Sequence, residues 1–177
     1  GPEVSDVDGN VEARRGTVSV FNGPPPDVRV LDEIGDEARV VGEWLAAAIE
    51  EGIAPHEIGV FVRSESELGR ALAAGEAAGV DTQVLDQRVS IATGKICVST
   101  MHLAKGLEFR AVVVMACDDE VLPLQSRIEA VADDVDLQEV YDTERHLLYV
   151  ACTRARDHLL VTGVDPASEF LDDLVGQ

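Results

Sequence analysis

The chain has 177 residues, of which 46% are apolar and only 4% aromatic, and its formal net charge is −20. One domain of this length buries about 70% of its extended-chain surface, around a core of aliphatic side chains. The charge excludes a general electrostatic attraction to nucleic acid, so any contact with phosphate must be local. No apolar run approaches the ~20 residues that a membrane span needs.

The cysteines are three in number and widely spaced, at Cys97, Cys117 and Cys152. Their spacing argues against both a zinc site and a disulfide framework. We therefore expect the three cysteines to be reduced and buried, and to pack as small apolar side chains in a cytoplasmic protein.

Strands and helices alternate along the sequence. Residues 1–16 are polar and aperiodic and predict a flexible tail, followed by a single domain over residues 17–177. The predicted strands cover residues 18–21, 28–31, 58–62, 82–85, 89–91, 96–100, 111–116 and 159–162. The predicted helices cover residues 36–51, 64–78, 137–155 and 166–174. This alternation is typical of an α/β fold with a mostly parallel sheet covered by helices on both faces.

Three local features refine these elements. Ser64 is predicted to cap the helix 64–78, whose inner side would carry Leu68, Ala71, Leu72 and Gly75. Residues 89–91 and 96–100 are predicted to form a hairpin. The helix 137–155 is expected to be the longest and to end with Arg154 in its last turn.

A guanidinium follows the apolar strand 58–62 directly, at Arg63. In parallel α/β sheets, ligands bind at the carboxyl ends of strands, and the planar guanidinium fork suits a phosphate. The alternative is an ordinary surface arginine.

The segment TMHLAKGLEF, residues 100–109, gathers several polar groups at a strand-to-helix turn. Thr100, His102 and the backbone around Lys105 and Gly106 are typical ligands of phosphate, of the kind that fix position without reading sequence. Glu108 can accept hydrogen bonds from sugar hydroxyls. For His102 alone, a structural role is the alternative.

Arg154 is a candidate to reach a neighbouring module and stabilise charge on a transferred phosphoryl group. The alternative is a cation that balances the helix dipole. No G-x-x-x-x-G-K-[ST] loop occurs, since Ile96 follows Gly94 and Lys95 where the loop needs Ser or Thr.

The segment 118–144 is strongly acidic, with ten carboxylates and one basic residue, Arg127. It predicts a solvated face, with a binding surface for a basic partner as the alternative. Asp118, Asp119 and Glu120 follow an apolar strand, as magnesium ligands of nucleotide-binding proteins do. Because the chain has no phosphate loop to share the metal, we interpret them as solvent-exposed acidic residues of a loop.

Three segments resemble motifs of UvrD/Rep-like superfamily 1 DNA helicases: IGVFVRS at 58–64, TMHLAKGLEF at 100–109 and ERHLLYVACTRA at 144–155. The resemblance implies the second, C-terminal RecA-like motor domain, a three-layer sandwich like that of the P-loop NTPases but without the P-loop. ATP and Mg²⁺ would be bound mainly by a missing N-terminal RecA-like domain of the same parent protein. Single-stranded DNA would cross both domains, and movement would run 3′ to 5′.

The resemblance also assigns individual residues. It implies contacts of Arg63 and Arg154 with the γ-phosphate, of Gly106 and Glu108 with the nucleotide (Glu108 on the ribose), and of Thr100, His102 and Lys105 with DNA. Leu103 and His146 depart from the usual motif residues. Only 37 positions separate Arg63 from Thr100, where many members of the family insert an accessory domain.

Three functions are therefore considered. The first is the motor domain of an ATP-dependent DNA helicase, inactive as an isolated fragment. The second is a helicase-like ATPase that remodels a protein–nucleic acid complex such as transcribing RNA polymerase, with the acidic segment as a docking surface. The third is a degenerate, non-catalytic binding module.

Overall fold

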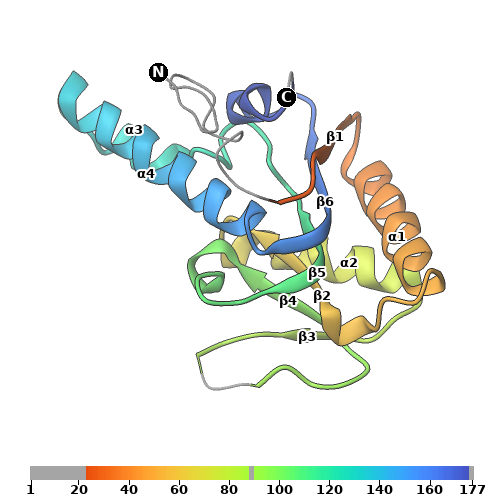
Figure 1. Ribbon diagram of the computed structural model, residues 1–177. Coiled ribbons are helices and arrows are strands. Elements are labelled where there is room, and N and C mark those ends of the chain that lie inside the picture. The colour runs from red at the N-terminus through yellow and green to blue at the C-terminus, as the bar shows by residue number, and fades with distance from the viewer. Residues whose placement is uncertain (1–22, 88–89, 176–177) are drawn as a thin grey trace.

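Six parallel strands form the centre of the molecule in the computed structural model, which describes residues 23–87 and 90–175 (Figure 1). The predicted tail 1–16 and the predicted strand 18–21 lie outside these residues. The sheet order is β1-β6-β5-β2-β4-β3, and every neighbouring pair is parallel. The strands are β1 (Pro26–Leu31), β2 (Ile58–Val62), β3 (Thr82–Val84), β4 (Ile96–Thr100), β5 (Phe109–Val114) and β6 (Ala155–Val164).

Helices cover both faces of the sheet, as predicted (Figure 1). On one face α1 (Ile34–Glu50) packs beside α2 (Leu68–Ala78). On the other face lies α4 (Asp134–Cys152), with the short α3 (Gln125–Glu129) beside it. Among the described residues, short 3-10 helices complete the connections: η2 (Pro55–Glu57), η3 (Glu65–Glu67), η4 (Met101–Leu103) and η5 (Glu169–Asp173). The fold is therefore a RecA-like α/β sandwich of three layers.

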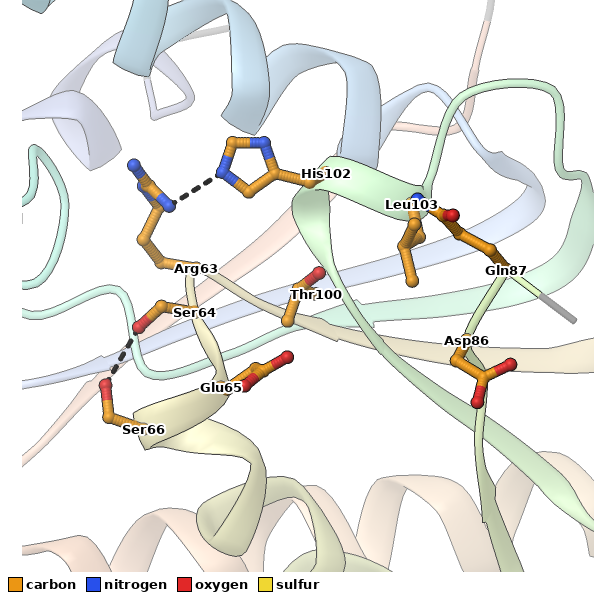
Figure 2. Close-up of a pocket in the computed structure, with 9 residues that line it drawn as sticks. All are labelled: Arg63, Ser64, Glu65, Ser66, Asp86, Gln87, Thr100, His102 and Leu103. Carbon is orange, nitrogen blue, oxygen red and sulfur yellow. Dashed lines mark hydrogen bonds between the residues drawn. The ribbon is translucent and has the colours of Figure 1, made fainter. Parts of the chain in front are cut away.

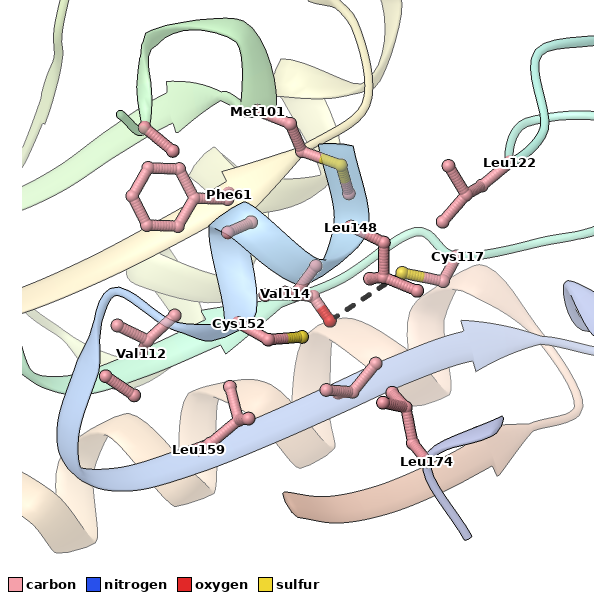
Figure 3. Close-up of a cluster of buried hydrophobic side chains, with 14 of the residues drawn as sticks. Phe61, Met101, Val112, Val114, Cys117, Leu122, Leu148, Cys152, Leu159 and Leu174 are labelled. Carbon is pink, nitrogen blue, oxygen red and sulfur yellow. Dashed lines mark hydrogen bonds between the residues drawn. The ribbon is translucent and has the colours of Figure 1, made fainter. Parts of the chain in front are cut away.

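The sheet separates two apolar clusters because successive strand residues point to opposite faces. Val60 of β2 and Val113 of β5 face α1 and α2. Phe61 and Val112, the adjacent residues, face α4 and pack with Leu148 (Figure 3). All five residues of β2 are buried, which explains why this strand is a continuous apolar run in the sequence.

The three cysteines are free and buried, as predicted. Burial raises the pKa of the Cys97 thiol to about 11 and that of Cys152 to about 12. Both therefore stay protonated at neutral pH and pack as small apolar side chains. Within residues 23–87 and 90–175, none of the helices combines the length and the apolar character that crossing a membrane requires.

The predicted hairpin over residues 89–100 is wrong. Thr82 of β3 is in register with Ile96 of β4, and the two strands run parallel. Residues 90 and 91, the described part of the predicted strand 89–91, are irregular. The Gln83 side chain donates to the Ser90 carbonyl and accepts from the Ala92 N–H, each at 2.8 Å. These bonds hold the segment as a crossing loop.

The start of α2 also differs from the prediction. Ser64 precedes η3, and its hydroxyl lies 2.9 Å from that of Ser66 instead of capping the backbone. The buried residues of α2 are Ala71, Ala74 and Gly75, whereas Leu72 is exposed. Small residues are needed at this face because α2 packs closely against α1.

Two helix boundaries near the carboxyl terminus differ between the prediction and the structure. The helix α4 ends at Cys152, so Arg154 lies in the turn before β6. The predicted helix 166–174 is the 3-10 helix η5, which begins only at Glu169, where the Ser168 hydroxyl accepts from the Phe170 N–H.

Candidate functional site

The candidate residues lie at two opposite edges of the parallel sheet. Arg63 follows the carboxyl end of β2, and Thr100 ends β4. Glu108 and Arg154 precede the amino ends of β5 and β6. Because β2, β5 and β6 are parallel neighbours, Arg63 and Arg154 are separated by the length of β5, on the order of 20 Å at ~3.3 Å per residue. Arg63 and Arg154 therefore lie at opposite edges of the sheet within this domain.

Arg63 is held by a buried ion pair at the carboxyl edge. It is 4% exposed and its partner Glu144 is 0% exposed. Arg63 Nε donates to Glu144 Oε1 at 2.8 Å, and Nη2 donates to Oε2 at 2.7 Å. Such bidentate, charge-assisted bonds are strong and directional. Arg63 is therefore anchored and largely buried, with its Nη1 directed to a partner other than Glu144.

Glu144 joins three parts of the chain. Besides Arg63, its carboxylate accepts from Arg127 Nη1 at 2.7 Å and from the Leu124 N–H at 2.9 Å. Burial by itself raises the pKa of the Glu144 carboxyl, but the hydrogen bonds from Arg63, Leu124 and Arg127 outweigh it and lower the pKa below its ordinary value. Glu144 is thus a buried anchor, although the sequence predicted a solvated acidic face over residues 118–144.

His102 accepts a hydrogen bond from the third nitrogen of the Arg63 guanidinium. Arg63 Nη1 lies 3.1 Å from His102 Nε2, and because a guanidinium can only donate, Nε2 is the acceptor. We therefore assign a neutral ring with its proton on Nδ1. The ring is exposed on η4 and is directed toward Arg63 (Figure 2).

A cavity of about 780 Å³ opens at this edge, lined among others by Arg63, Ser64, Thr100 and His102 (Figure 2). Hydroxyl and imidazole groups are suited to fixing a phosphate by hydrogen bonds. Asp86 lies on the opposite side of the cavity from Arg63 and His102. Lys105, which was predicted to contact the same ligand as Thr100 and His102, is exposed but is not among the residues that line this cavity.

Arg154 is held at the amino edge. Its Nε donates to the Val150 carbonyl at 3.0 Å, Nη1 to the Leu107 carbonyl at 3.1 Å, and Nη2 to the Thr153 hydroxyl at 3.0 Å. Each Nη atom carries a second N–H, so the anchored group can also donate to an anion. Arg154 is therefore preorganised, and its half-buried side chain borders open space.

The open space beside Arg154 is a cavity of about 350 Å³, lined among others by Glu108, Thr153, Arg154 and Arg156. Glu108 and Arg156 are exposed, with Arg156 Nη1 3.9 Å from Glu108 Oε2. Gly106 has a φ of 85°, a conformation that glycine adopts without strain, in the turn that leads to Glu108. The cavity thus offers guanidinium donors for phosphate and a carboxylate that can accept from sugar hydroxyls.

A further polar network joins α1, α2 and the ends of β5 and β6. Buried Glu37 accepts from Arg70 Nη2 at 2.6 Å, the Ala116 N–H at 2.8 Å and the Thr162 hydroxyl at 2.6 Å. Arg70 Nη1 also donates to Asp118 at 2.6 Å. The prediction that Asp118 is solvated is therefore wrong. In the described part of the chain, no group of three or more metal-ligating side chains could hold a metal ion.

Sequence reasoning missed Glu37 and Glu144 as anchors. Each lies on the apolar stripe of its helix: Glu37 is four residues before Val41, and Glu144 is four residues before Leu148. A carboxylate within a buried stripe requires a buried partner, and this is the signal that could have identified both.

Comparison with known proteins agrees with this fold. Residues 80–165 match the family of UvrD-like helicase C-terminal domains. The chain is 40% identical over 67 residues to the ATP-dependent DNA helicase PcrA of Staphylococcus aureus strain Mu50, covering 38% of this chain and 8% of the relative. It is 36% identical over 92 residues to the ATP-dependent DNA helicase PcrA of Bacillus subtilis strain 168, covering 51% and 12%. The chain thus matches only a small part of the length of these relatives.

A solved structure is similar over most of the domain. The crystal structure of the C-terminal domain of a possible DNA helicase from Lactobacillus plantarum WCFS1 has a TM-score of 0.63 and 25% identity. The match covers 87% of this chain and 83% of that one. Together with the sequence matches, this similarity supports a UvrD-like helicase C-terminal domain in this chain.

Proposed function

We propose that this chain is the C-terminal motor domain of an ATP-dependent DNA helicase or translocase. One observation carries the proposal. A preorganised arginine, Arg154, borders an open cavity with Glu108 at the amino edge of the sheet, while Thr100 and His102 border a separate cavity at the carboxyl edge. Two sites on opposite edges suit a domain that handles a nucleotide at one and a polymer backbone at the other.

At the amino edge, Arg154 would stabilise negative charge on the transferred phosphoryl group, and Glu108 would accept from the ribose hydroxyls. Gly106 would allow the turn that brings Glu108 there. Arg63 is left out of this site because its guanidinium is bound to Glu144 at the other edge. The proposal thus assigns one arginine of this chain, Arg154, to the transferred phosphoryl group.

ATP and Mg²⁺ would be bound mainly by an N-terminal RecA-like domain of the parent protein. This chain has no phosphate loop, since no G-x-x-x-x-G-K-[ST] occurs in it. Its donors fit the phosphate end of a nucleotide, because Arg154 keeps N–H groups that its anchoring bonds do not use. The chain would thus complete a site that another domain begins.

At the carboxyl edge, Thr100 and His102 would hydrogen-bond the phosphates of single-stranded DNA. Such contacts fix position without reading sequence. They would be local, since the net charge of −20 opposes any general attraction to DNA. Movement 3′ to 5′ is part of the proposal through the family likeness.

Replacing Arg154 with Ala in the intact parent tests the proposal. We expect the ATP turnover number to fall roughly 10³-fold or more, while ATP affinity changes little, because most phosphate contacts would lie in the other domain. Arg39→Ala, an exposed arginine on α1, is the matched control and should leave turnover unchanged. An unchanged turnover number in Arg154→Ala would remove Arg154 from catalysis.

A second candidate is a helicase-like ATPase that remodels a protein–nucleic acid complex such as transcribing RNA polymerase. It is favoured by the interval between Arg63 and Thr100, in which the described residues form only η3, α2, β3, a loop and β4. The described part of the interval therefore contains no accessory domain for separating strands. Strand displacement by the intact parent would support the helicase, whereas polymerase capture without displacement would support the remodelling ATPase.

A further inference from the structure

Two segments of the chain run from one edge of the sheet to the other. Residues 100–109 begin at the carboxyl edge with Thr100 and end at the amino edge before β5. Residues 144–154 of α4 and the following turn cover the same span, from Glu144 to Arg154. We call these two segments together the brace.

Hydrogen bonds of an arginine join the two segments of the brace at each edge of the sheet, and we call each of these connections a tie. At the carboxyl edge, Arg63 binds Glu144 of one segment and His102 of the other. At the amino edge, Arg154 Nη1 donates to the Leu107 carbonyl, and the Arg154 carbonyl accepts from the Phe109 N–H at 2.9 Å. Each tie joins the two segments through an arginine.

The segments are also packed together between the ties. Met101 and Ala104 of one belong to the same buried cluster as Leu148 and Ala151 of the other, and Figure 3 shows Met101 beside the helix that carries Leu148. Close-packed interiors transmit displacements because they contain little free volume to absorb them. A shift at one tie is therefore carried toward the other.

The tie at the carboxyl edge lies where an anion would bind. Arg63 lines the cavity with Thr100 and His102, and its Nη1 donates to a neutral imidazole nitrogen. A phosphate oxygen is a stronger acceptor for a guanidinium N–H than a neutral nitrogen. A phosphate in the cavity would therefore compete with His102 for Nη1, or bind the second N–H of that atom. Since the other two guanidinium nitrogens bind Glu144, a change of partner at Nη1 would act on α4 through that ion pair.

We propose that Glu144 is a positioning residue that couples the DNA site at the carboxyl edge to Arg154 at the amino edge. This inference rests on the proposed function and adds the residue that links its two sites. Coupling between binding sites is reciprocal, so a nucleotide phosphate at Arg154 would in turn change the affinity for DNA.

The test uses the 177-residue chain and a short oligothymidylate as probe. Side-chain NMR follows the Nε–Hε signals of Arg63 and Arg154 with the signals of Thr100 and His102. In the wild type, all four residues should shift on titration. In Glu144→Gln, Thr100 and His102 should still shift, but the Arg154 response should be lost. Glu139→Gln, the same change at an exposed position of α4, should behave as the wild type.

The outcomes separate the inference from the proposed function. A response at Thr100 and His102 without one at Arg154 in the wild type overturns the coupling alone. So does an Arg154 response that persists in Glu144→Gln. If no residue responds, the DNA site fails and the coupling fails with it.

Arg63→Lys covers the case in which Glu144→Gln does not fold. Lysine keeps the positive charge but lacks the planar fork, so it cannot bind both Glu144 oxygens and a third partner in the same geometry. The Arg154 response should again be lost, and its persistence would contradict the coupling.

Discussion

Arg63 and Glu144 depend on each other because both side chains are almost completely buried. Their side chains are 5% and 0% exposed, and each supplies the hydrogen bonds that the other loses on burial. Among the described residues, removing Glu144 leaves Arg63 without a carboxylate partner, and removing Arg63 leaves Glu144 with only Arg127 and the Leu124 N–H as donors. Either loss costs more than losing an exposed pair. The pair therefore stabilises the fold and also lies beside the candidate site.

Arg63→Ala should therefore lower the free energy of unfolding by up to about 3–5 kcal/mol, the cost of breaking a buried ion pair. Arg39→Ala, which removes an exposed pair with Asp36 and Glu43, should change it by less than about 1 kcal/mol. Urea denaturation of both variants measures the difference. Equal stabilities would mean that the Arg63–Glu144 pair contributes no more than a surface contact.

The lowered pKa of Glu144 predicts a dependence of stability on pH. Folding favours the ionised carboxylate, so its contribution is complete above the ordinary value of 4.5 and is lost as pH falls through the lower folded pKa. The stability difference between wild type and Glu144→Gln should thus be largest near neutral pH and shrink in acid. Urea denaturation from neutral pH to below 4.5 checks this, and a constant difference would contradict it.

At the scale of the elements, α1 and α2 approach closely enough to require a glycine. A Cβ at Gly42 would lie 2.7 Å from the Ala77 Cβ and 3.2 Å from the Ala74 carbonyl oxygen. Neither atom can rotate away, so the helices would have to separate. This close approach holds α2, and with it the Arg70–Glu37 pair, against α1.

Gly42→Ala should therefore destabilise the protein by about 1–3 kcal/mol through overpacking, despite the better helix propensity of alanine. Gly69→Ala in α2 is the matched control, since a Cβ added there would meet no atom within 4 Å. It should stabilise by up to about 1 kcal/mol. Thermal unfolding of both variants measures the contrast, and a stabilised Gly42→Ala would show that the interface can relax.

At the scale of the whole molecule, the domain completes its own core but not its proposed site. Apolar clusters fill both faces of the sheet, whereas the cavity beside Arg154 is open. The sequence contains no phosphate loop to hold a nucleotide against that arginine. This chain would thus be sufficient for folding, whereas catalysis would also require the domain that carries the phosphate loop.

We expect the purified chain to hydrolyse ATP no faster than background, with or without DNA, and the intact parent to show turnover. The measurement is steady-state phosphate release, with Arg154→Ala in the chain as the control for a contaminating ATPase. Turnover well above background that Arg154→Ala abolishes would contradict the shared site.

Much of the fold could be predicted from the sequence because its signals are local. Strands β2 and β5 are continuous apolar runs since both their faces are buried, and α1 shows an apolar face at three- and four-residue steps. The hairpin failed because a turn glycine, Gly94, marks a change of direction but does not say which strand comes next in the sheet. In the structure β3 and β4 pair in parallel, and α2 packs against β4.

By itself, the sequence determined the alternation of strands and helices, the aliphatic core and the motifs that carry Thr100, His102, Glu108 and Arg154, because each is a pattern of neighbouring residues. Only the tertiary structure decided that Arg63 and Arg154 lie at opposite edges and that Arg63 is bound by Glu144. Those two residues are 81 positions apart. Their contact depends on the order of the strands and on the face where α4 packs, and neither is encoded in local spacing.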